Sequence, residues 1–112
     1  METNEILDKG NCITVSAIGG FSFYQAKDFI GRGGAGSAIK ILYGSTINEK
    51  NALFICAILQ QTLSKYDYTT MLSGDKLKKE FIYLPVKKDG TPDFSFMEKY
   101  TESLQIELKM WI

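Results

Sequence analysis

Residues 52–59 carry the sequence ALFICAIL, the longest apolar run in the chain. Polar residues lie on both sides of it, from Asn48 to Asn51 before it and at Gln60 and Gln61 after it. The length of the run and its polar ends predict a helix over residues 49–65. Asn48 is a suitable cap, because its side chain can accept a hydrogen bond from a free N–H of the first turn. Since the middle of this helix is apolar all round, we expect it at the centre of the core.

Short strands are predicted on both sides of this helix. Residues 12–16 are rich in β-branched side chains, and residues 21–24 alternate between apolar and small ones. The turn signal Ile18-Gly19-Gly20 lies between them, so the two strands are close enough to form a hairpin. Residues 38–42 and 81–85 are further candidate strands, the second ended by proline. The pattern predicts an α/β (α+β) fold, with a small mixed or antiparallel sheet around one buried helix.

A second helix is predicted at the C-terminal end. Residues 87–90 contain an Asp-Gly turn, and Thr91 then provides an N-cap, Pro92 a first helical residue and Asp93 a charge that complements the helix dipole. Five apolar residues of this segment share one stripe, about 80° wide on a helix: Met97, Tyr100, Leu104, Leu108 and Trp111. We expect Leu104, Leu108 and Trp111 to contact a second copy of the chain or a helix of a partner.

Composition limits the possible chemistry. The 112 residues suit one domain, and 45% of them are hydrophobic. The chain has no histidine, so neither a Ser-His-Asp triad nor a Cys-His pair can form within it. Its two cysteines, Cys12 and Cys56, are expected to be buried free thiols, too few for a zinc site. We therefore predict no catalytic residue, no metal and no cofactor.

The sequence also bears on where the protein works. No apolar run approaches the roughly 20 residues that span a bilayer, so no membrane partner is expected. The first ten residues are polar and acidic, which does not fit a signal peptide. We expect the protein in the cytoplasm.

A glycine-rich segment raises the possibility of nucleotide binding. Gly31, Gly33 and Gly36 match the pattern G-x-G-x-x-G. That pattern binds a dinucleotide when a helix follows it, because the helix N-terminus then meets the pyrophosphate. Here the predicted strand 38–42 follows. We therefore expect a flexible loop without a bound nucleotide.

Three parts of the chain, in their order and spacing, resemble one family. The matching segments are Gly10–Ser16 with Gly19-Gly20 and Phe23-Tyr24-Gln25, then Ala52–Ile55 with Lys65-Tyr66, then Lys76–Glu80, Ile82, Leu84-Pro85, Asp89–Phe94 and Phe96–Glu98. Together they are similar to the target-recognition domain of type I restriction–modification specificity subunits and of related fused restriction–methylation enzymes. The resemblance covers about residues 10–103.

The resemblance implies a non-catalytic DNA-recognition domain followed by a long spacer helix. In this family two such domains each recognise half of a split DNA site, and the spacer docks the methyltransferase subunits. Family domains have further strands ahead of the first matching segment, so we expect residues 1–90 to form a partial target-recognition domain. Residues 91–112 would begin the coiled-coil spacer. The implied partners are double-stranded DNA, a DNA methyltransferase subunit, a restriction subunit and a second copy of the chain.

Candidate DNA-contacting residues lie in the polar loops. Base edges are recognised by hydrogen-bonding side chains, while lysine and arginine contacts to phosphate set the position of the protein. Arg32 is the only arginine and is flanked by glycine, and Gln25 has the amide that pairs with adenine. The other candidates are a polar aromatic cluster, Tyr66, Tyr68 and Thr69, and a basic run, Lys76, Lys78 and Lys79. Each candidate also has an interpretation without DNA contact. Gln25 would be a surface amide, the tyrosines would pack at the edge of the core, and the lysines and Arg32 would be solvated charges.

A second class of function stays open. The chain has 13 basic and 13 acidic residues, whereas an independent DNA-binding domain is usually basic. A neutral chain also fits a structural module that pairs through its C-terminal helix without binding DNA. Salt-sensitive DNA binding distinguishes the two hypotheses.

Overall fold

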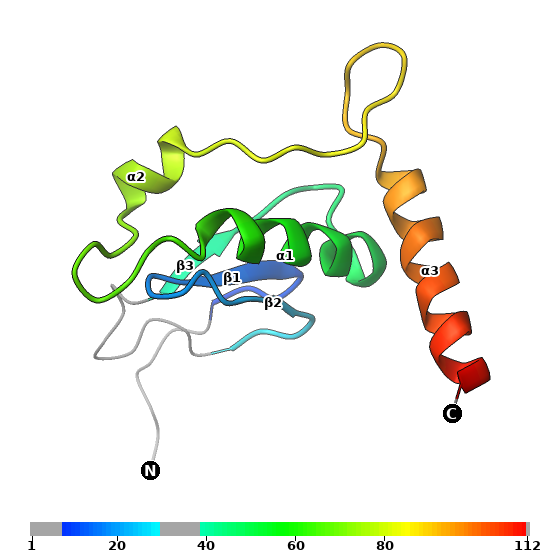
Figure 1. The fold of residues 1–112 in the computed structure, drawn as a ribbon, viewed down its shortest axis with the longest axis horizontal. Helices are drawn as coiled ribbons and strands as arrows, with labels where there is room; N and C mark the ends of the chain where they lie inside the picture. The colour runs from blue at the N-terminus through cyan, green and yellow to red at the C-terminus, as the bar shows by residue number, and fades with distance from the viewer. Residues whose placement is uncertain (1–7, 30–38, 112) are drawn as a thin grey trace.

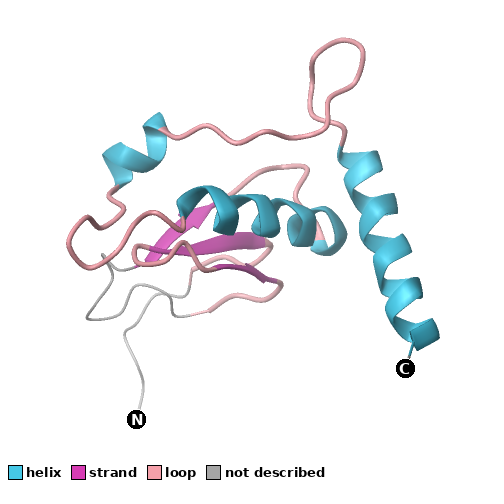
Figure 2. Cartoon of the chain, viewed as in Figure 1, coloured by secondary structure: helices cyan, strands magenta, loops and turns pink. Residues whose placement is uncertain are grey.

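The computed structural model describes residues 8–29 and 39–111, with side chains up to residue 105. Its elements are β1 (Cys12–Ser16), β2 (Ser22–Gln25), β3 (Ile39–Leu42), α1 (Glu49–Leu63), α2 (Gly74–Lys79) and α3 (Phe94–Trp111). Helix α1 lies across one face of the sheet, and α3 crosses the N-terminal end of α1 (Figures 1 and 2). The predicted fold class, a small antiparallel sheet with helices, is confirmed. No helix in the described part of the chain is long and apolar enough to cross a membrane.

The sheet has the strand order β2-β1-β3, and both pairs are antiparallel. The predicted hairpin is present, and the three N-terminal strands lie within one residue of their predicted bounds. The hairpin turn contains Gly19 and Gly20 with φ of 79° and 70°, a region that glycine enters without strain. Gly20 also lies against the end of α1, where a Cβ atom would be 2.6 Å from the carbonyl carbon of Leu63. The glycine pair therefore fixes the hairpin against the helix.

Helix α1 begins as predicted, with Asn48 as its cap. The Asn48 side chain accepts hydrogen bonds from the backbone N–H groups of Lys50 and Asn51, both at 3.0 Å. Asn51 reciprocates, since its Oδ1 accepts from the backbone N–H of Asn48 at 2.9 Å. This capping box uses asparagine where glutamate or glutamine is usual. Two free donors at the helix end are thereby satisfied.

The expectation that α1 lies at the centre of the core holds for one face of the helix. The helix buries one face, formed by Asn51, Ala52, Ile55, Cys56, Leu59 and Leu63. Leu53 and Ala57 are exposed on the other side. The reason is that the sheet covers one face of α1, while α3 covers only part of the remainder. Part of the apolar run 52–59 therefore stays exposed among the described residues.

The strand predicted over residues 81–85 is also absent. This segment is extended but pairs with no strand of the described residues. Ile82 and Leu84 pack against the core, which explains the alternating pattern in the sequence. The segment runs alongside α1 on its way from α2 to α3 (Figure 1). Its side chains alternate as in a strand, but no described strand lies beside it to form backbone hydrogen bonds.

Each helix departs from expectation at one point, and α1 ends at Leu63, two residues before its predicted end. Helix α2 forms in a segment predicted to be irregular, because Ser73 caps it by accepting from the N–H of Lys76 at 3.2 Å. Helix α3 begins at Phe94, two residues later than predicted. Asp93 is its cap and accepts from the N–H of Phe96 at 3.0 Å. Thr91 instead belongs to the preceding turn, where its hydroxyl and N–H donate to Asp89.

The two cysteines are free and buried, as predicted. Burial raises the pKa of the Cys56 thiol to about 11. The pKa of Cys12 is also raised, by burial first and by the nearby charge of Asp8 second. Both thiols are therefore protonated near neutral pH and behave as small apolar groups.

Candidate functional site

One end of the molecule brings together most of the predicted DNA-contacting residues. The loop after α1, residues 64–73, is bound to the β1–β2 hairpin by two backbone hydrogen bonds. The N–H of Gly19 donates to the carbonyl of Tyr66 at 2.7 Å, and the N–H of Leu72 donates to the carbonyl of Ala17 at 2.9 Å. Helix α2 follows this loop directly. The hairpin turn, the loop and α2 thus form a continuous surface, which we call the basic end.

Tyr66 anchors the basic end. Its side chain is 9% exposed and belongs to the hydrophobic core. The ammonium groups of Lys65 and Lys76 lie 5.6 and 5.9 Å from the centre of its ring, within the range of cation–π attraction. Lys65 also pairs with Glu80, whose hydrogen bond raises the pKa of that lysine. Tyr66 therefore holds two positive charges in place and has little surface of its own.

Tyr68 and Thr69 lie in a tight turn organised by Asp67. The carboxylate of Asp67 accepts three hydrogen bonds of 2.7–2.9 Å, from the hydroxyl and N–H of Thr69 and the N–H of Thr70. These bonds lower the pKa of Asp67, and the bond from the Thr69 hydroxyl is the largest cause. The turn leaves Tyr68 83% exposed. Its ring and hydroxyl are available to a ligand.

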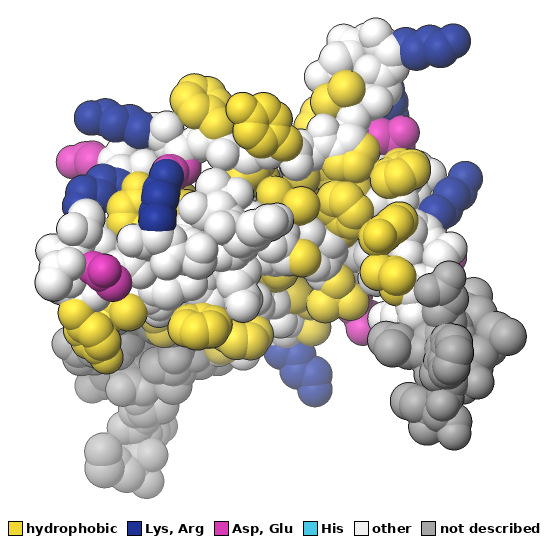
Figure 3. Space-filling view, viewed as in Figure 1, with side chains coloured by type: hydrophobic (Ala, Val, Ile, Leu, Met, Phe, Trp, Pro, Cys, Tyr) yellow, Lys and Arg dark blue, Asp and Glu magenta, His cyan; other side chains and the backbone are white. Residues whose placement is uncertain are grey.

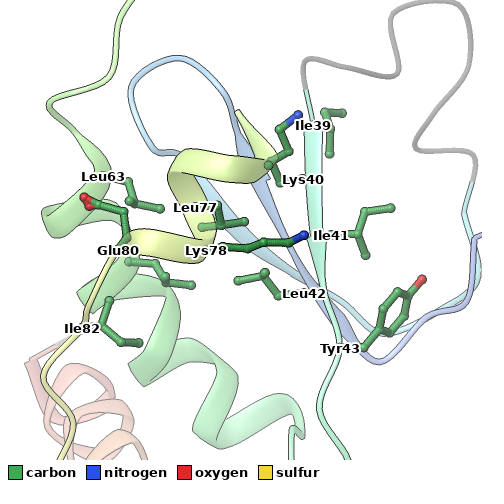
Figure 4. Close-up of a pocket in the computed structure, with 12 residues that line it drawn as sticks. Ile39, Lys40, Ile41, Leu42, Tyr43, Leu63, Leu77, Lys78, Glu80 and Ile82 are labelled. Carbon is green, nitrogen blue, oxygen red and sulfur yellow. The ribbon is translucent and has the colours of Figure 1, made fainter. Parts of the chain in front are cut away.

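The three predicted lysines lie in the last turn of α2, and all are exposed. Lys76 is held by a hydrogen bond of 3.2 Å to the carbonyl of Met71. Lys78 extends over a pocket between α2 and β3 (Figure 4). Positive charges thus extend from Lys65 through α2. This arrangement can bind an anionic surface.

The pocket under Lys78 has a volume of about 720 Å³. Apolar side chains from both sides of the space line it, including Leu42 of β3, Leu63 of α1 and Leu77 of α2. Lys40, Lys78 and Glu80 contribute its charged groups. Within the described residues no group of acidic or cysteine side chains could hold a metal ion. The pocket offers apolar contact with charged groups around it.

Gln25 lies away from the basic end. Gln25 pairs with Cys12 at the opposite end of β1 from Ser16, about 13 Å away at the usual rise of a strand. Its side-chain amide donates to the hydroxyl of Thr14 at 3.2 Å. Arg32, with the glycine-rich segment 31–36, lies outside the described residues. The structure thus unites Tyr66, Tyr68, Thr69 and the three lysines, but separates Gln25 from them.

The predicted partner interface is described only at its first residue. Leu104 is half-exposed and lines a groove between α1 and α3. Further along the groove, Tyr100 packs edge-on against Phe54 and stacks with Phe96. Met97, at the start of the stripe, is fully buried. The side chains of Leu108 and Trp111 lie outside the described residues.

Polar contacts fix the direction of α3 relative to α1. Glu98 accepts hydrogen bonds from the side-chain amides of Asn48 at 3.2 Å and Asn51 at 3.4 Å. One turn later, Glu102 pairs with Lys50 and raises the pKa of that lysine. The base of α3 is therefore bound to the capping box of α1.

The chain is similar over part of its length to one protein with a stated role. It is 40% identical over 53 residues to the type II restriction enzyme BgcI specificity subunit S.BcgI of Heyndrickxia coagulans. The match covers 47% of this chain and 16% of that subunit. No family model matches the sequence, and no solved structure matches it. The match therefore spans about a sixth of that subunit's length, and over these residues the chain is similar to a restriction enzyme specificity subunit.

Sequence reasoning missed one residue of the basic end. The sequence predicts Lys65 as the last residue of the helix 49–65, whereas the helix ends at Leu63 and the Lys65 ammonium lies over the Tyr66 ring and pairs with Glu80. The available signal was its position next to Tyr66, in a segment that already carried the family resemblance. Its pairing with a residue 15 positions away depends on the fold and has no local signature.

Proposed function

We propose that this chain is a DNA sequence-recognition component of a restriction–modification system and carries no catalytic activity itself. The observation that carries the proposal is the 40% identity over 53 residues to a restriction enzyme specificity subunit. The basic end supports it, since exposed lysines lie beside a polar turn with an exposed tyrosine. Such a surface provides phosphate contacts and base contacts side by side.

The basic end contacts double-stranded DNA in this proposal. Lys76, Lys78 and Lys79 bind phosphates and set the position of the duplex. Tyr68 and Thr69 approach base edges, while Tyr66 supports the lysines around it. Gln25 and Arg32 stay candidates for a second contact, since Gln25 lies away from the basic end and Arg32 is outside the described residues.

The C-terminal helix connects recognition to the rest of the system. We assign residues 1–90 to a partial target-recognition domain and residues 91–112 to the start of a spacer. Leu104, Leu108 and Trp111 then contact a partner helix, either of a DNA methyltransferase subunit or of a second copy of the chain. A restriction subunit is a further candidate partner. The binding of Glu98 and Glu102 to the N-terminal end of α1 supports a spacer that leaves the domain in a fixed direction.

Salt-dependent binding tests this function. Fluorescence anisotropy of a labelled, mixed-sequence duplex is measured over a series of salt concentrations. Affinity falls as salt rises, so the slope of log affinity against log salt is negative. Each lost phosphate contact reduces the steepness of this slope by about 0.9. We therefore expect Lys78→Ala with Lys79→Ala to reduce the steepness by about 2. The matched control is Lys27→Ala with Lys99→Ala, which removes the same charge from exposed positions elsewhere.

Three results contradict the proposal. The wild-type chain fails to bind the duplex, its affinity does not depend on salt, or both double variants change the slope equally. Cleavage or methylation of DNA by the purified chain would contradict its non-catalytic role. Failure of the wild-type chain to bind the duplex would also favour the alternative.

The alternative is a structural module that pairs through α3 without DNA. The apolar groove between α1 and α3 and the net charge of zero favour it. Sedimentation of the wild-type chain and of Leu104→Ala with Leu108→Ala measures self-association. Association that these changes abolish, together with no DNA binding, would support this module.

A further inference from the structure

Two aromatic side chains beyond the basic end are almost fully exposed. Phe81 is 82% and Tyr83 is 90% exposed, the latter the most exposed large apolar side chain among the described residues. They alternate with Ile82 and Leu84, which pack against the core. The extended backbone therefore turns both aromatic rings to the same side, away from the protein.

The segment that carries these rings is held at both ends. On the α2 side, the N–H of Glu80 donates to the carbonyl of Leu77 at 3.1 Å, and the Glu80 carboxylate pairs with Lys65. On the α3 side, the carbonyl of Pro85 accepts from the N–H of Asp93 at 2.8 Å. Ile82 and Leu84 fix the middle. Phe81 and Tyr83 are thus presented on a defined backbone.

Exposure of this kind requires an explanation. Exposed apolar side chains that stand alone are ordinary, but adjacent aromatic rings on an ordered segment are typical of a binding surface. Among the described residues, the segment packs on the core through Ile82 and Leu84 and leaves both rings exposed. Their contribution therefore lies in contact with a ligand.

The charges around the two rings indicate the kind of ligand. Residues 76–88 contain five lysines and one acidic residue, Glu80. That carboxylate is already paired with Lys65. The rings thus lie between the lysines of α2 and the pair Lys87-Lys88. In Figure 3 hydrophobic side chains project from the segment between α2 and α3, with lysines near both of its ends.

A protein strand is a weaker candidate than a nucleic acid. The backbone of residues 81–84 is extended, so a strand could pair with it, but the flanking lysines would add affinity only for an acidic partner. DNA satisfies both features. Its phosphates neutralise lysines, and its grooves accept apolar side chains against a thymine methyl group or between base pairs.

We propose that Phe81 and Tyr83 contact the bases of double-stranded DNA, while Lys78 and Lys79 on one side and Lys87 and Lys88 on the other bind the flanking phosphates. This assignment rests on the proposed function and extends the DNA-binding surface from the basic end along the segment to α3. Base contact makes the two rings contributors to sequence preference. The lysines contribute affinity for any sequence.

Photo-crosslinking tests the contact directly. A labelled mixed-sequence duplex carries 5-iododeoxyuridine in place of thymidine, so the iodine occupies the position of the thymine methyl group. After irradiation of the complex with the full chain, trypsin releases the peptide of residues 80–87, which contains both rings. We expect the crosslink in this peptide. Crosslinks confined to other peptides overturn the proposal.

Affinity measurements separate the rings from the lysines. Phe81→Ala and Tyr83→Ala should each weaken binding about tenfold without changing the salt slope. Lys87→Ala with Lys88→Ala should reduce the steepness of the slope by about 2. Phe23→Ala, which removes an exposed ring on β2, is the matched control and should bind like the wild type.

The outcomes distinguish this inference from the proposed function. Salt-dependent binding by the wild type with unchanged affinity of both ring variants overturns the inference and leaves the function standing. Absence of wild-type binding overturns both. If sedimentation shows that the ring variants lose self-association but keep their affinity for DNA, the rings form a protein interface and the inference fails. Circular dichroism checks that every variant is folded.

Discussion

Side chains are buried at the contact between α1 and α3, whereas two large side chains are exposed in the segment after α2. At the contact, Met97 and Asn51 are fully buried, and the Asn51 amide donates to the carbonyl of Thr46 at 2.8 Å and to Glu98. In the segment after α2, Phe81 and Tyr83 are almost fully exposed. Among the described residues, every buried polar side-chain atom has a hydrogen-bond partner.

The difference separates residues that specify the fold from residues that are free to bind. A buried side chain contributes to stability through packing, and its loss leaves a cavity. An exposed side chain loses few contacts when it is shortened, so stability does not explain its presence. Substitutions at the contact of α1 with α3 should therefore lower stability. Substitutions of the exposed rings should weaken binding and leave stability nearly unchanged.

The largest expected effect is at the contact of α1 with α3. Met97→Ala should lower the free energy of unfolding by about 3 kcal/mol, because the side chain is fully buried and its removal leaves a cavity. Urea denaturation followed by circular dichroism measures the change. Leu104→Ala, on the same face of α3 but half-exposed, is the matched control and should cost less than about 1 kcal/mol. Equal losses for the two variants would mean that α3 does not pack through Met97.

The next largest effect is expected at Gly20, which we compare with Gly90 because both have a positive φ. Gly20→Ala should cost more than about 2 kcal/mol, because its φ of 70° strains alanine and the new Cβ would lie 2.6 Å from the backbone of Leu63. Gly90 has φ of 88°, but a Cβ there meets no atom within 4 Å. Gly90→Ala should therefore cost only about 1 kcal/mol. A smaller cost at Gly20 than at Gly90 would contradict the close packing of the hairpin on α1.

Local sequence signals predicted the elements whose causes are local. Asn48 has the side chain of a helix cap, and Gly19-Gly20 allows the backbone of a tight turn, so their structures follow from the residues themselves. The same reasoning failed at residues 81–85. Their alternation is real, but a strand also needs a neighbour, and that depends on distant parts of the chain. Helix α2 was missed because it is short and polar and depends on one capping serine.

The candidate site was predictable in composition but not in arrangement. The lysines and tyrosines could be named from the sequence, since their types suit phosphate and base contacts. That Tyr66 is buried in the core, while Tyr68 two positions later is exposed, depends on how the loop docks on the hairpin. The separation of Gln25 from the lysines likewise depends on strand register. Neither has a signature in the local sequence.

A pH dependence is expected from the buried thiol of α1. Burial raises the pKa of Cys56 from 9.0 to about 11, so the folded state holds this proton more tightly than the unfolded chain. The resulting stability is present below about pH 9 and is lost as the pH rises towards 11, with a total of about 2 kcal/mol. Denaturation of the wild type and Cys56→Ala at several pH values measures it. If both proteins lose stability equally across this range, the thiol is not the cause.

The smallest effect on stability is expected in the segment after α2. Phe81→Ala and Tyr83→Ala should each change the free energy of unfolding by less than about 0.5 kcal/mol, because their rings are exposed and the packing of Ile82 and Leu84 is retained. Ile82→Ala is the matched comparison from the same segment, and it should cost more than about 1 kcal/mol because its side chain packs on the core. Urea denaturation of the three variants tests the pattern. A large loss at Phe81 or Tyr83 would show that the rings serve the fold, and their exposure would then no longer support a role in binding. A negligible loss combined with weaker DNA binding would separate binding from stability within four consecutive residues.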